Sequence, residues 1–372
     1  MRIAMLGHKR IPSREGGVEI VVGELSTRMA ALGHDVTCYN RRGHHVSGGE
    51  FDKAKMSEYN GVRIKTVPTV DKKGLAAVSS SIFAAIKAAF GRYDVVHFHA
   101  EGPCAACLLP KLTGKRVIAT IHGLDWQRSK WGGFASKYIK FGEKSAAKHA
   151  DEIIVLSENV KRYFKDTYNR DTVLIPNGVS KPEIADDTLI KEKYSLCKDG
   201  YFLYLGRLVP EKGVEYLINA YKTLETDKKL VIAGGSSDTS DFERHLHELA
   251  ADDERIIFTG FVEGRELSEL YSNAYVYVLP SDLEGMPLSL LEAMSYGNCC
   301  LTSDIPECTE AVGEYALTFK KGDVSSLAQT LETLGNSEDL VHSYKSKAQR
   351  YICDKFNWDD VTAKTLDLYN KQ

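Results

Sequence analysis

Two carboxylates in the second half of the chain stand where they could bind a ligand rich in hydroxyl groups. Glu284 precedes a stretch that predicts a helix, and Glu292 lies inside that helix, so both can reach one cleft. Gly285 allows a tight approach, Pro287 suits a first helical turn, and N–H groups at a helix start favour an anion. Carboxylates also accept hydrogen bonds from sugar hydroxyls. The candidate residues of this predicted polyol site are Glu284, Gly285, Met286, Pro287, Leu288 and Glu292.

A second candidate is the loop Gly206–Gly213, which leaves a predicted strand and enters a predicted helix. It carries Arg207 and Lys212 at the carboxyl end of a strand, where open α/β sheets bind ligands. Two cations there suit a diphosphate, because each charge-assisted hydrogen bond contributes about 1.5–3 kcal/mol. The alternative is solvated surface charge, which the position of the loop at a strand end disfavours.

The first predicted strand leads into a loop that ends with Gly16 and Gly17 at the start of a helix. Glycines there let the backbone approach an anion, and the helix dipole favours negative charge. The loop contains neither Gly-x-Gly-x-x-Gly nor Gly-Lys-Ser/Thr, which disfavours a nicotinamide dehydrogenase and a P-loop ATPase. An ordinary β-α turn that needs glycine for its backbone angles is the alternative interpretation.

Histidines end two further predicted strands. His97 and His99 alternate along one strand and so point to one side, with His99 nearer the strand end. His122 follows the next strand, and Asp125 is the only nearby carboxylate that could act as a base for a hydroxyl group. These residues predict a polar cleft, although histidines satisfied within a core would give the same pattern.

The chain offers no clear metal site. It contains no Asp-x-Asp, although enzymes that neutralise a diphosphate with Mg²⁺ need acidic ligands. Arg207, Lys212 and helix dipoles can neutralise that charge instead, so we expect neither a metal nor another cofactor. Cys104 and Cys107 form a lone Cys-x-x-Cys, which predicts close-packed small residues at a helix start rather than a zinc site.

The elements that position these residues follow from apolar runs that alternate with helix-like stretches. Near-continuous Val/Ile/Leu runs suit strands buried on both faces, and helices between them indicate β-α-β units of a parallel sheet. The fold class is therefore α/β. The predicted strands are Ile3–Leu6, Val36–Tyr39, Val62–Val67, Val95–Phe98, Val117–Ile121, Ile153–Leu156, Val173–Ile175, Tyr201–Leu205, Leu230–Ala233, Ile256–Phe258, Tyr275–Leu279, Cys299–Leu301 and Ala316–Phe319.

The chain divides into two predicted domains. At roughly 150 residues per domain, its 372 residues suggest two. A polar stretch follows Ile175-Pro176-Asn177-Gly178, and a new strand begins at Tyr201. We therefore expect one domain over residues 1–178 and another over 179–357. A last helix, from about Trp358 to Tyr369, could pack on either domain.

Composition excludes several classes of protein. The 48 basic and 51 acidic side chains give a formal net charge of -3, which argues against a dedicated nucleic-acid binder. No apolar run approaches the roughly 20 residues of a membrane span, and the first residues lack the pattern of a signal peptide. We expect the eight cysteines to be reduced and the protein to be cytosolic.

The motifs together resemble those of retaining glycosyltransferases of family 4. The resemblance covers essentially the whole chain, and the motifs occur in the expected order. They are Gly16-Gly17, Ile121-His122-Gly123, Ile175-Pro176-Asn177-Gly178, Gly206-Arg207-Leu208 with Lys212-Gly213, and Glu284 with Gly285, Pro287 and Glu292. The segments Arg10–Glu19 and His122–Trp126 further resemble bacterial surface-polysaccharide enzymes, including rhamnosyltransferases.

The resemblance implies a GT-B fold, in which two Rossmann-like domains with doubly wound parallel sheets face a central cleft. The C-terminal domain would bind a UDP- or dTDP-linked sugar, and the last helix, about 358–372, would pack back on the N-terminal, acceptor-side domain. Arg207 and Lys212 would hold the diphosphate, Glu284 the donor sugar and Glu292 the ribose. His122 would lie beside the donor sugar. Gly16, Gly17, His99, Asp125 and Asn177 complete the expected substrate-binding residues.

One segment could bring such an enzyme to the inner face of the plasma membrane. Six basic residues and a single acid, Glu143, lie between Arg128 and Lys148, with aromatic residues at helical spacing. This pattern suits an anionic membrane surface, where lipid-linked acceptors reside. The aromatic stripe could equally be the core face of a domain helix.

Two rival functions stay open on the sequence alone. One is a related GT-B enzyme, such as a nucleotide-sugar epimerase or a phosphorylase, and an epimerase would need no acceptor. The other is a non-catalytic protein that binds a sugar nucleotide or a glycan. The intact set of Arg207, Lys212, Glu284 and Glu292 argues against the second.

Overall fold

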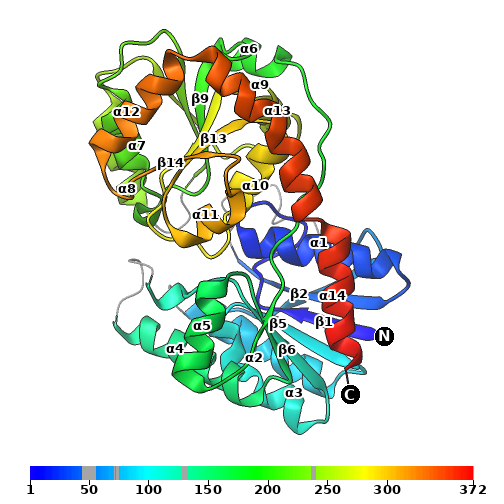
Figure 1. Cartoon of the computed structure of the whole chain (residues 1–372). Helices are drawn as coiled ribbons and strands as arrows, with labels where there is room; N and C mark the ends of the chain where they lie inside the picture. Colours follow the sequence, from blue (N-terminus) through cyan, green and yellow to red (C-terminus); the bar gives the residue numbers. More distant parts are fainter. Residues whose placement is uncertain (44–55, 71, 73–74, 128–132, 236–239, 372) are drawn as a thin grey trace. The chain divides into compact units, whose positions relative to one another are not determined.

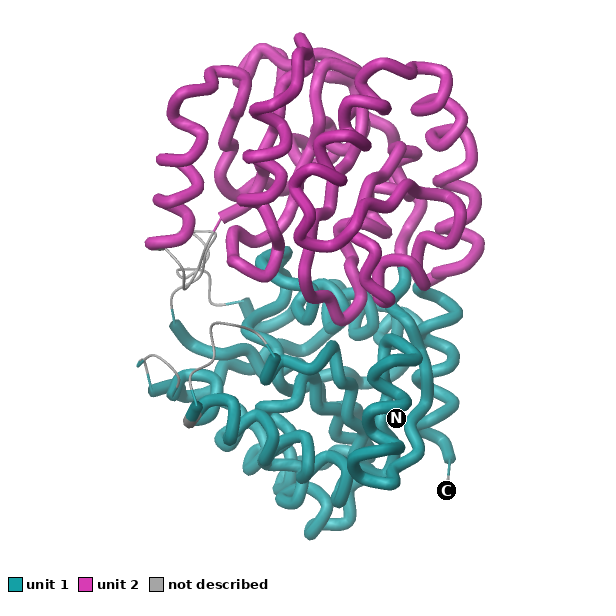
Figure 2. Tube along the Cα trace, turned by 60° about the vertical axis from the view of Figure 1, so that its left-hand side comes forward, with its two compact units in different colours: residues 1–178, 358–372 teal, residues 179–357 magenta. Residues whose placement is uncertain are grey.

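The computed structural model describes residues 1–43, 56–70, 72, 75–127, 133–235 and 240–371. The chain forms two compact units, shown in teal and magenta in Figure 2. The N-terminal unit comprises Met1–Gly178 together with Trp358–Gln372, and the C-terminal unit comprises Val179–Asn357. The division after Gly178 falls where the polar stretch of the sequence begins.

The N-terminal unit is built on one sheet with the strand order β3-β4-β2-β1-β5-β6-β7-β8 in the described residues. Every neighbouring pair is parallel except β3 and β4. Apolar strands lie in its middle because helices cover both faces. The strands are β1 (Arg2–Leu6), β2 (Asp35–Arg41), β3 (Glu58–Tyr59), β4 (Val62–Val67), β5 (Val95–His99), β6 (Arg116–Ile121), β7 (Glu152–Val155) and β8 (Val173–Leu174).

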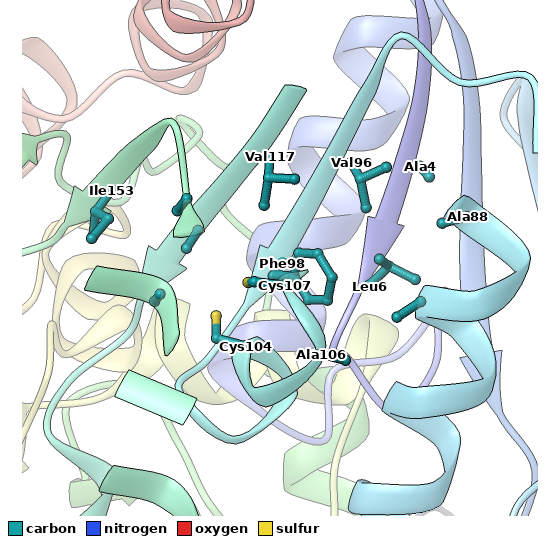
Figure 3. Close-up of a cluster of buried hydrophobic side chains, with 14 of the residues drawn as sticks. Ala4, Leu6, Ala88, Val96, Phe98, Cys104, Ala106, Cys107, Val117 and Ile153 are labelled. Carbon is teal, nitrogen blue, oxygen red and sulfur yellow. The ribbon is translucent and has the colours of Figure 1, made fainter. Parts of the chain in front are cut away.

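The core on one face of this sheet explains the small residues of the sequence. Alternate strand residues, such as Leu6 and Phe98, point into this core, where Cys104 and Cys107 also lie fully buried (Figure 3). The two cysteines come from the 3-10 helix η2 (Gly102–Ala106) and the residue after it, so the prediction of close-packed small residues is confirmed. The other helices of this layer are α2 (Leu75–Phe90), α3 (Leu108–Leu112), α4 (Gly133–His149) and α5 (Glu158–Tyr168).

The opposite face of the same sheet carries α1 (Gly17–Ala31) and α14 (Trp358–Asn370), which pack beside each other (Figure 1). Along α1 the predicted apolar positions Val21, Val22, Leu25 and Met29 are buried. Leu32, which continues that spacing, is instead 64% exposed, because the helix has already ended.

The last helix belongs to the N-terminal unit and is fixed there by specific contacts. The Tyr369 hydroxyl lies 2.6 Å from Nδ1 of His97 on β5, and Arg116 Nε donates to the carbonyl of Leu368 (2.9 Å). A Cβ on Gly178 would lie 2.6 Å from Trp358, so a glycine is needed where the helix begins. The fixed position of α14 thus depends on residues distant in the sequence.

The C-terminal unit has a second parallel sheet, with the order β11-β10-β9-β12-β13-β14 in its described residues (Figure 1). Its strands are β9 (Tyr201–Leu205), β10 (Lys229–Ala233), β11 (Ile256–Gly260), β12 (Val276–Leu279), β13 (Cys299–Ser303) and β14 (Leu317–Phe319). Its helices are α6 (Thr188–Tyr194), η4 (Pro210–Lys212), α7 (Val214–Tyr221), α8 (Ser240–Ala250), α9 (Gly264–Asn273), α10 (Leu288–Ser295), α11 (Pro306–Val312), α12 (Val324–Gly335) and α13 (Glu338–Lys355). The predicted class of two parallel-sheet α/β domains is confirmed.

None of the helices in the described part of the chain combines the length and the apolarity that crossing a bilayer requires.

Candidate active site

Both sheets reverse their strand order at a single strand, and this topology locates the candidate sites. β1 lies between β2 and β5, and β9 lies between β10 and β12. In open α/β sheets, ligands bind outside the carboxyl ends of the strands at this switch point. The motifs predicted from the sequence follow β1, β5 and β6 in one unit and β9 and β12 in the other.

The basic loop after β9 is held against the loop after β12 by close backbone contacts. Gly213 has a φ of +66°, and a Cβ there would lie 2.0 Å from the carbonyl oxygen of Pro280. Gly234, with a φ of +137°, approaches the Gly206 carbonyl in the same way. The Asp282 N–H also donates to the Glu211 carbonyl (2.9 Å). These glycines are therefore required for the two loops to meet.

Lys212 and Glu284 meet across these loops in a largely buried ion pair. Lys212 Nζ lies 2.6 Å from Glu284 Oε1, and the side chains are 14% and 8% exposed. Ser281 Oγ donates to the same oxygen (2.6 Å) and fixes the carboxylate. Because an ammonium has three N–H donors, Lys212 retains donors for a second anion while it holds Glu284.

Arg207 differs from Lys212 in that its charge has no partner. Within the described residues its guanidinium makes no ion pair, and its side chain is partly exposed. The Tyr204 hydroxyl donates to the Arg207 carbonyl (2.8 Å), which fixes the backbone at the end of β9. The structure thus presents one neutralised and one unneutralised cation on the same loop.

Helix α10 supplies the remaining predicted residues of this unit. It begins at Leu288, with Pro287 as the residue before it rather than within its first turn. The Tyr277 hydroxyl donates to the carbonyl of Leu205 (3.2 Å) and lies 2.8 Å from Ser289 Oγ, which ties the helix start to the end of β9.

The side chains around this helix start differ in exposure. Gly285, Pro287 and Leu288 are buried, whereas Met286 is partly exposed. Glu292 is also partly exposed, and the Tyr271 hydroxyl lies 3.4 Å from its Oε2. The two glutamates and Met286 therefore combine a polar or flexible side chain with access to solvent.

In the N-terminal unit, the loop after β1 is seated against the end of β5. Gly7 has a φ of +104°, and a Cβ there would lie 2.1 Å from the carbonyl oxygen of His99. Glu19, in the first turn of α1, accepts a hydrogen bond from the Lys9 N–H (2.8 Å). A Cβ on Gly16 would lie 2.6 Å from Oε2 of Glu19. The predicted anion site at Gly16 and Gly17 therefore already contains a carboxylate.

The three histidines lie in a row, with the rings of His97 and His99 in contact and His99 hydrogen-bonded to His122, but only one of them faces outward. His97 and His99 are fully buried, whereas His122 is partly exposed. His97 Nε2 contacts Thr120 Oγ1 (2.7 Å), and His99 Nδ1 contacts His122 Nε2 (3.1 Å). Burial lowers the pKa of His97 to about 3 and lowers that of His99 well below its ordinary value. His97 and His99 are therefore neutral at pH 7.

Because His99 is neutral, only one of its two ring nitrogens carries a proton. Its Nε2 is buried without a hydrogen-bond partner in the described residues. In the described residues, the hydrogen bond that His99 makes through its ring is therefore the one between Nδ1 and His122. The buried His99 thus contacts the partly exposed His122, and its role in substrate binding stays a prediction.

A cluster of acids that the sequence did not reveal lies behind Asp125. The Asp125 N–H donates to Oε2 of Glu101 (2.8 Å), and Glu101 is fully buried. Burial, followed by the nearby Asp125 and Glu143, raises the pKa of Glu101 well above its ordinary value. Glu143, also fully buried, accepts hydrogen bonds from the hydroxyls of Tyr163 (2.8 Å) and Tyr168.

Two remaining predictions concern the end of the unit and its basic segment. Asn177 is buried after β8, next to the glycine that admits Trp358. Of the basic segment, residues 128–132 lie outside the described residues. On α4, Glu143 and Ile139 are buried, whereas Phe141 and the lysines at 137, 140, 144 and 148 are exposed.

In the described part of the chain, no group of three or more histidine, cysteine, aspartate or glutamate side chains could hold a metal ion. All eight cysteines lie in that part, and none forms a disulfide.

Comparison with known proteins assigns this arrangement to a family. Residues 15–181 match a family model described as Glycosyltransferase Family 4, and residues 186–351 match one described as Glycosyl transferases group 1. YqgM of Bacillus subtilis, an uncharacterised glycosyltransferase, is 31% identical over 269 residues, which cover 70% of each chain. The chain belongs to the family 4 glycosyltransferases.

This glycosyltransferase is also 30% identical to O-antigen chain mannosyltransferase B of Escherichia coli over 186 residues, 48% of each chain. Its fold is similar to that of Anabaena HepE in complex with UDP and glucose, with a TM-score of 0.78, 16% identity and 98% of each chain covered. The predicted GT-B fold is thereby confirmed.

Proposed function

We propose that this glycosyltransferase moves a sugar from a UDP- or dTDP-linked donor to a saccharide or lipid-linked acceptor during the synthesis of a bacterial surface polysaccharide. The observation that carries the proposal is the unpaired Arg207 beside the Lys212–Glu284 ion pair at the carboxyl ends of β9 and β12. The O-antigen mannosyltransferase and the UDP complex of HepE support the classes of acceptor and donor. The transferred sugar would be a hexose or a deoxyhexose such as rhamnose.

The C-terminal unit would bind the donor. Arg207 has its whole charge available for the diphosphate, and Lys212 has N–H donors left over from its bond to Glu284. Glu284 would accept hydrogen bonds from the hydroxyls of the donor sugar, and Glu292 those from the ribose. The N–H groups around Met286 and Leu288 would add positive partial charge.

The N-terminal unit would bind the acceptor. His122, held by the buried His99, would contact the transferred sugar, and Asp125, held by Glu101, would orient the attacking hydroxyl. Gly16, Gly17 and Asn177 would complete the cleft. We infer that the enzyme is cytoplasmic and meets its acceptor at the inner face of the plasma membrane.

We infer a retaining transfer that requires no metal. No side chain in the predicted set is an obvious covalent nucleophile, so the acceptor oxygen would attack the anomeric carbon from the face that the diphosphate leaves. The new C–O bond forms as the bond to the phosphate oxygen breaks, and that oxygen takes the proton of the acceptor hydroxyl. Arg207 and Lys212 would stabilise the negative charge that develops on the diphosphate.

The first test is calorimetric titration of the protein with UDP, dTDP, GDP and ADP in the presence of EDTA. We expect selective binding of UDP or dTDP, and the same selectivity after Mg²⁺ is added. Failure to bind any of the four would contradict the donor site. A requirement for added metal would contradict the cationic mechanism. Product analysis with donor alone separates a transferase, which leaves the sugar unchanged, from an epimerase.

A further inference from the structure

Helix α2 of the N-terminal unit has the reverse of the usual amphipathic arrangement. The residues that face the sheet are small, namely Ser80, Ser81, Ala84, Ala85, Ala88 and Ala89. The residues that face away are large and apolar, namely Ile82, Phe83, Ile86 and Phe90, and Phe90 is 83% exposed. A surface helix normally presents polar side chains to water, so this face is suited to an apolar environment.

Helix α3 extends this apolar surface. It packs beside α2 and exposes Leu108, Leu109 and Leu112, of which Leu112 is 73% exposed. Contiguous exposed apolar residues on two neighbouring helices indicate an interaction site, whereas single exposed residues do not. We call these seven residues of α2 and α3 the apolar face.

The charges around the apolar face have one sign. Residues 75–93 and 102–116 contain no aspartate or glutamate, and their charged residues are Lys87, Arg92, Lys111, Lys115 and Arg116. Lys111 and Arg116 pair with Asp151 and Glu152 at the start of the next strand. Within the described residues, Lys87, Arg92 and Lys115 make no ion pair, so their charges remain available to an external anion.

A basic cavity of about 690 Å³ adjoins the end of α2 at the amino edge of the sheet. Its cations are Arg2, Arg63, Lys65, Lys87 and Arg92, and its single acid is Asp35. Arg2 and Arg63 have carboxylate partners, whereas Lys65 donates only to the hydroxyl of Tyr93 (3.3 Å). Because Lys87, Phe90 and Arg92 line this cavity, the apolar face and the basic cavity form one continuous feature.

We propose that the apolar face and the basic cavity dock this glycosyltransferase on a bilayer of anionic phospholipid. The apolar side chains enter the interface between headgroups and acyl chains, and the cavity takes phosphate-bearing headgroups. The proposal needs neither the donor site nor the acceptor assigned above, because it depends on a different edge of the N-terminal unit.

The charges favour a membrane over a second copy of the chain. A symmetric dimer through this surface would bring Lys87 and Arg92 of each copy towards the same residues of the other, and the acid that lines the cavity, Asp35, is already paired with Arg63. Helix α4 fits a membrane less well, although its lysines are exposed. Phe141 is its one exposed large apolar residue among those described.

The test is sedimentation of the full chain with vesicles of phosphatidylglycerol and phosphatidylcholine, and with vesicles of phosphatidylcholine alone, at low salt. We expect binding to the anionic vesicles and release by high salt. Lys87→Gln with Arg92→Gln should lower the partition coefficient roughly 30-fold, because each basic residue near the surface contributes about fivefold. Ile86→Asp with Phe90→Asp should abolish binding.

Matched variants distinguish this surface from others. Lys144→Gln with Lys148→Gln removes two exposed charges from α4, and Leu32→Asp alters an exposed apolar residue that follows α1. We expect wild-type vesicle binding for both. All variants should bind UDP as the wild-type protein does, which separates this proposal from the donor site.

Three results would overturn the proposal. One is wild-type protein that stays in the supernatant with anionic vesicles. Another is undiminished binding by the α2 variants, and the third is loss of binding confined to the α4 variant. A change of oligomeric state in the α2 variants, measured by light scattering without vesicles, would identify the surface as a contact between copies instead.

Discussion

The carboxyl edges of the two sheets use the same topology for different electrostatics. In the C-terminal unit, Arg207, Lys212 and Glu284 are charged, and one of the two cations is unpaired. In the N-terminal unit, burial lowers the pKa of His99 and raises that of Glu101, and the two residues contact the partly exposed His122 and Asp125. The first edge suits a charged diphosphate, and the second suits the orientation of uncharged hydroxyl groups. The two edges therefore present different chemistry to a ligand.

Removing the unpaired cation should have the largest effect. We expect Arg207→Ala to lower kcat/KM by about 10²–10³-fold, because a donor aimed at developing charge is lost. Binding of UDP should also weaken in calorimetry. Arg350→Ala, which removes a 91% exposed arginine of α13, is the control and should leave both quantities unchanged. If the Arg207 variant kept a near-normal kcat/KM, the unpaired charge would not be what distinguishes the edge of the C-terminal unit, and the comparison between the two edges would fail.

The two edges also have one feature in common. At Gly7 and at Gly213, a loop packs closely against a neighbouring carbonyl oxygen. We expect Gly213→Ala to destabilise the C-terminal unit by roughly 4 kcal/mol, through its positive φ and the overlap with Pro280. Gly322→Ala has a similar φ, +70°, but no atom within 4 Å. It should cost only about 1–2 kcal/mol. If urea unfolding showed equal losses of stability for the Gly213 and Gly322 variants, the backbone around Pro280 would relax to accept the added Cβ without cost.

Glu284→Gln distinguishes the roles of Glu284 and Lys212 at the carboxyl edge of the C-terminal unit. We expect kcat/KM with the sugar nucleotide to fall by about 10–100-fold, because a charge-assisted bond to a hydroxyl is worth about 1.5–3 kcal/mol. Affinity for UDP, which has no sugar beyond its diphosphate, should be unchanged or higher, since Lys212 is no longer neutralised. Weaker binding of UDP would instead place Glu284 in the diphosphate site.

The carboxyl edge of the N-terminal unit predicts a smaller effect, a change of stability with pH. Because the pKa of Glu101 is raised in the folded chain, its contribution to stability is full below its ordinary pKa of 4.5. It is lost as pH rises towards the raised value, since the unfolded chain then releases the proton first. Glu101→Gln stays neutral, so its Tm should fall less than that of the wild-type protein between about pH 5 and about pH 8. Glu58→Gln, an exposed control, should keep the wild-type slope.

The strands could be predicted from the sequence because parallel strands are uniformly apolar. Each of the predicted runs, from Ile3–Leu6 to Ala316–Phe319, lies on a strand of the structure. The edge strand β3 was missed, since Glu58 and Tyr59 pair with β4 only and carry no apolar run. Leu32 continues the apolar spacing of α1 but is exposed, because periodicity does not reveal that α1 ends at Ala31.

The residues of the candidate site also fall into those that the sequence reveals and those that it does not. Charged residues in loops after strands, such as Arg207 and Glu284, could be identified from type and position. Glu101 and Glu143 could not, because acids are usually exposed and nothing local marks these two as buried. The one indirect signal is Gly142, where a Cβ would lie 2.1 Å from the carbonyl oxygen of Glu101. Its meaning depends on which segment packs there, and that is a property of the fold.

The placement of α14 has a consequence for how the chain is made. The ribosome releases residues in order, so β5 emerges long before the Tyr369 that contacts His97. The N-terminal unit therefore waits, with one face of its sheet only partly covered, until the entire C-terminal unit has been synthesised. The C-terminal unit is contiguous in sequence, so it can reach its complete native structure before the N-terminal unit does. This order is the reverse of the usual one, in which the N-terminal domain folds first during synthesis.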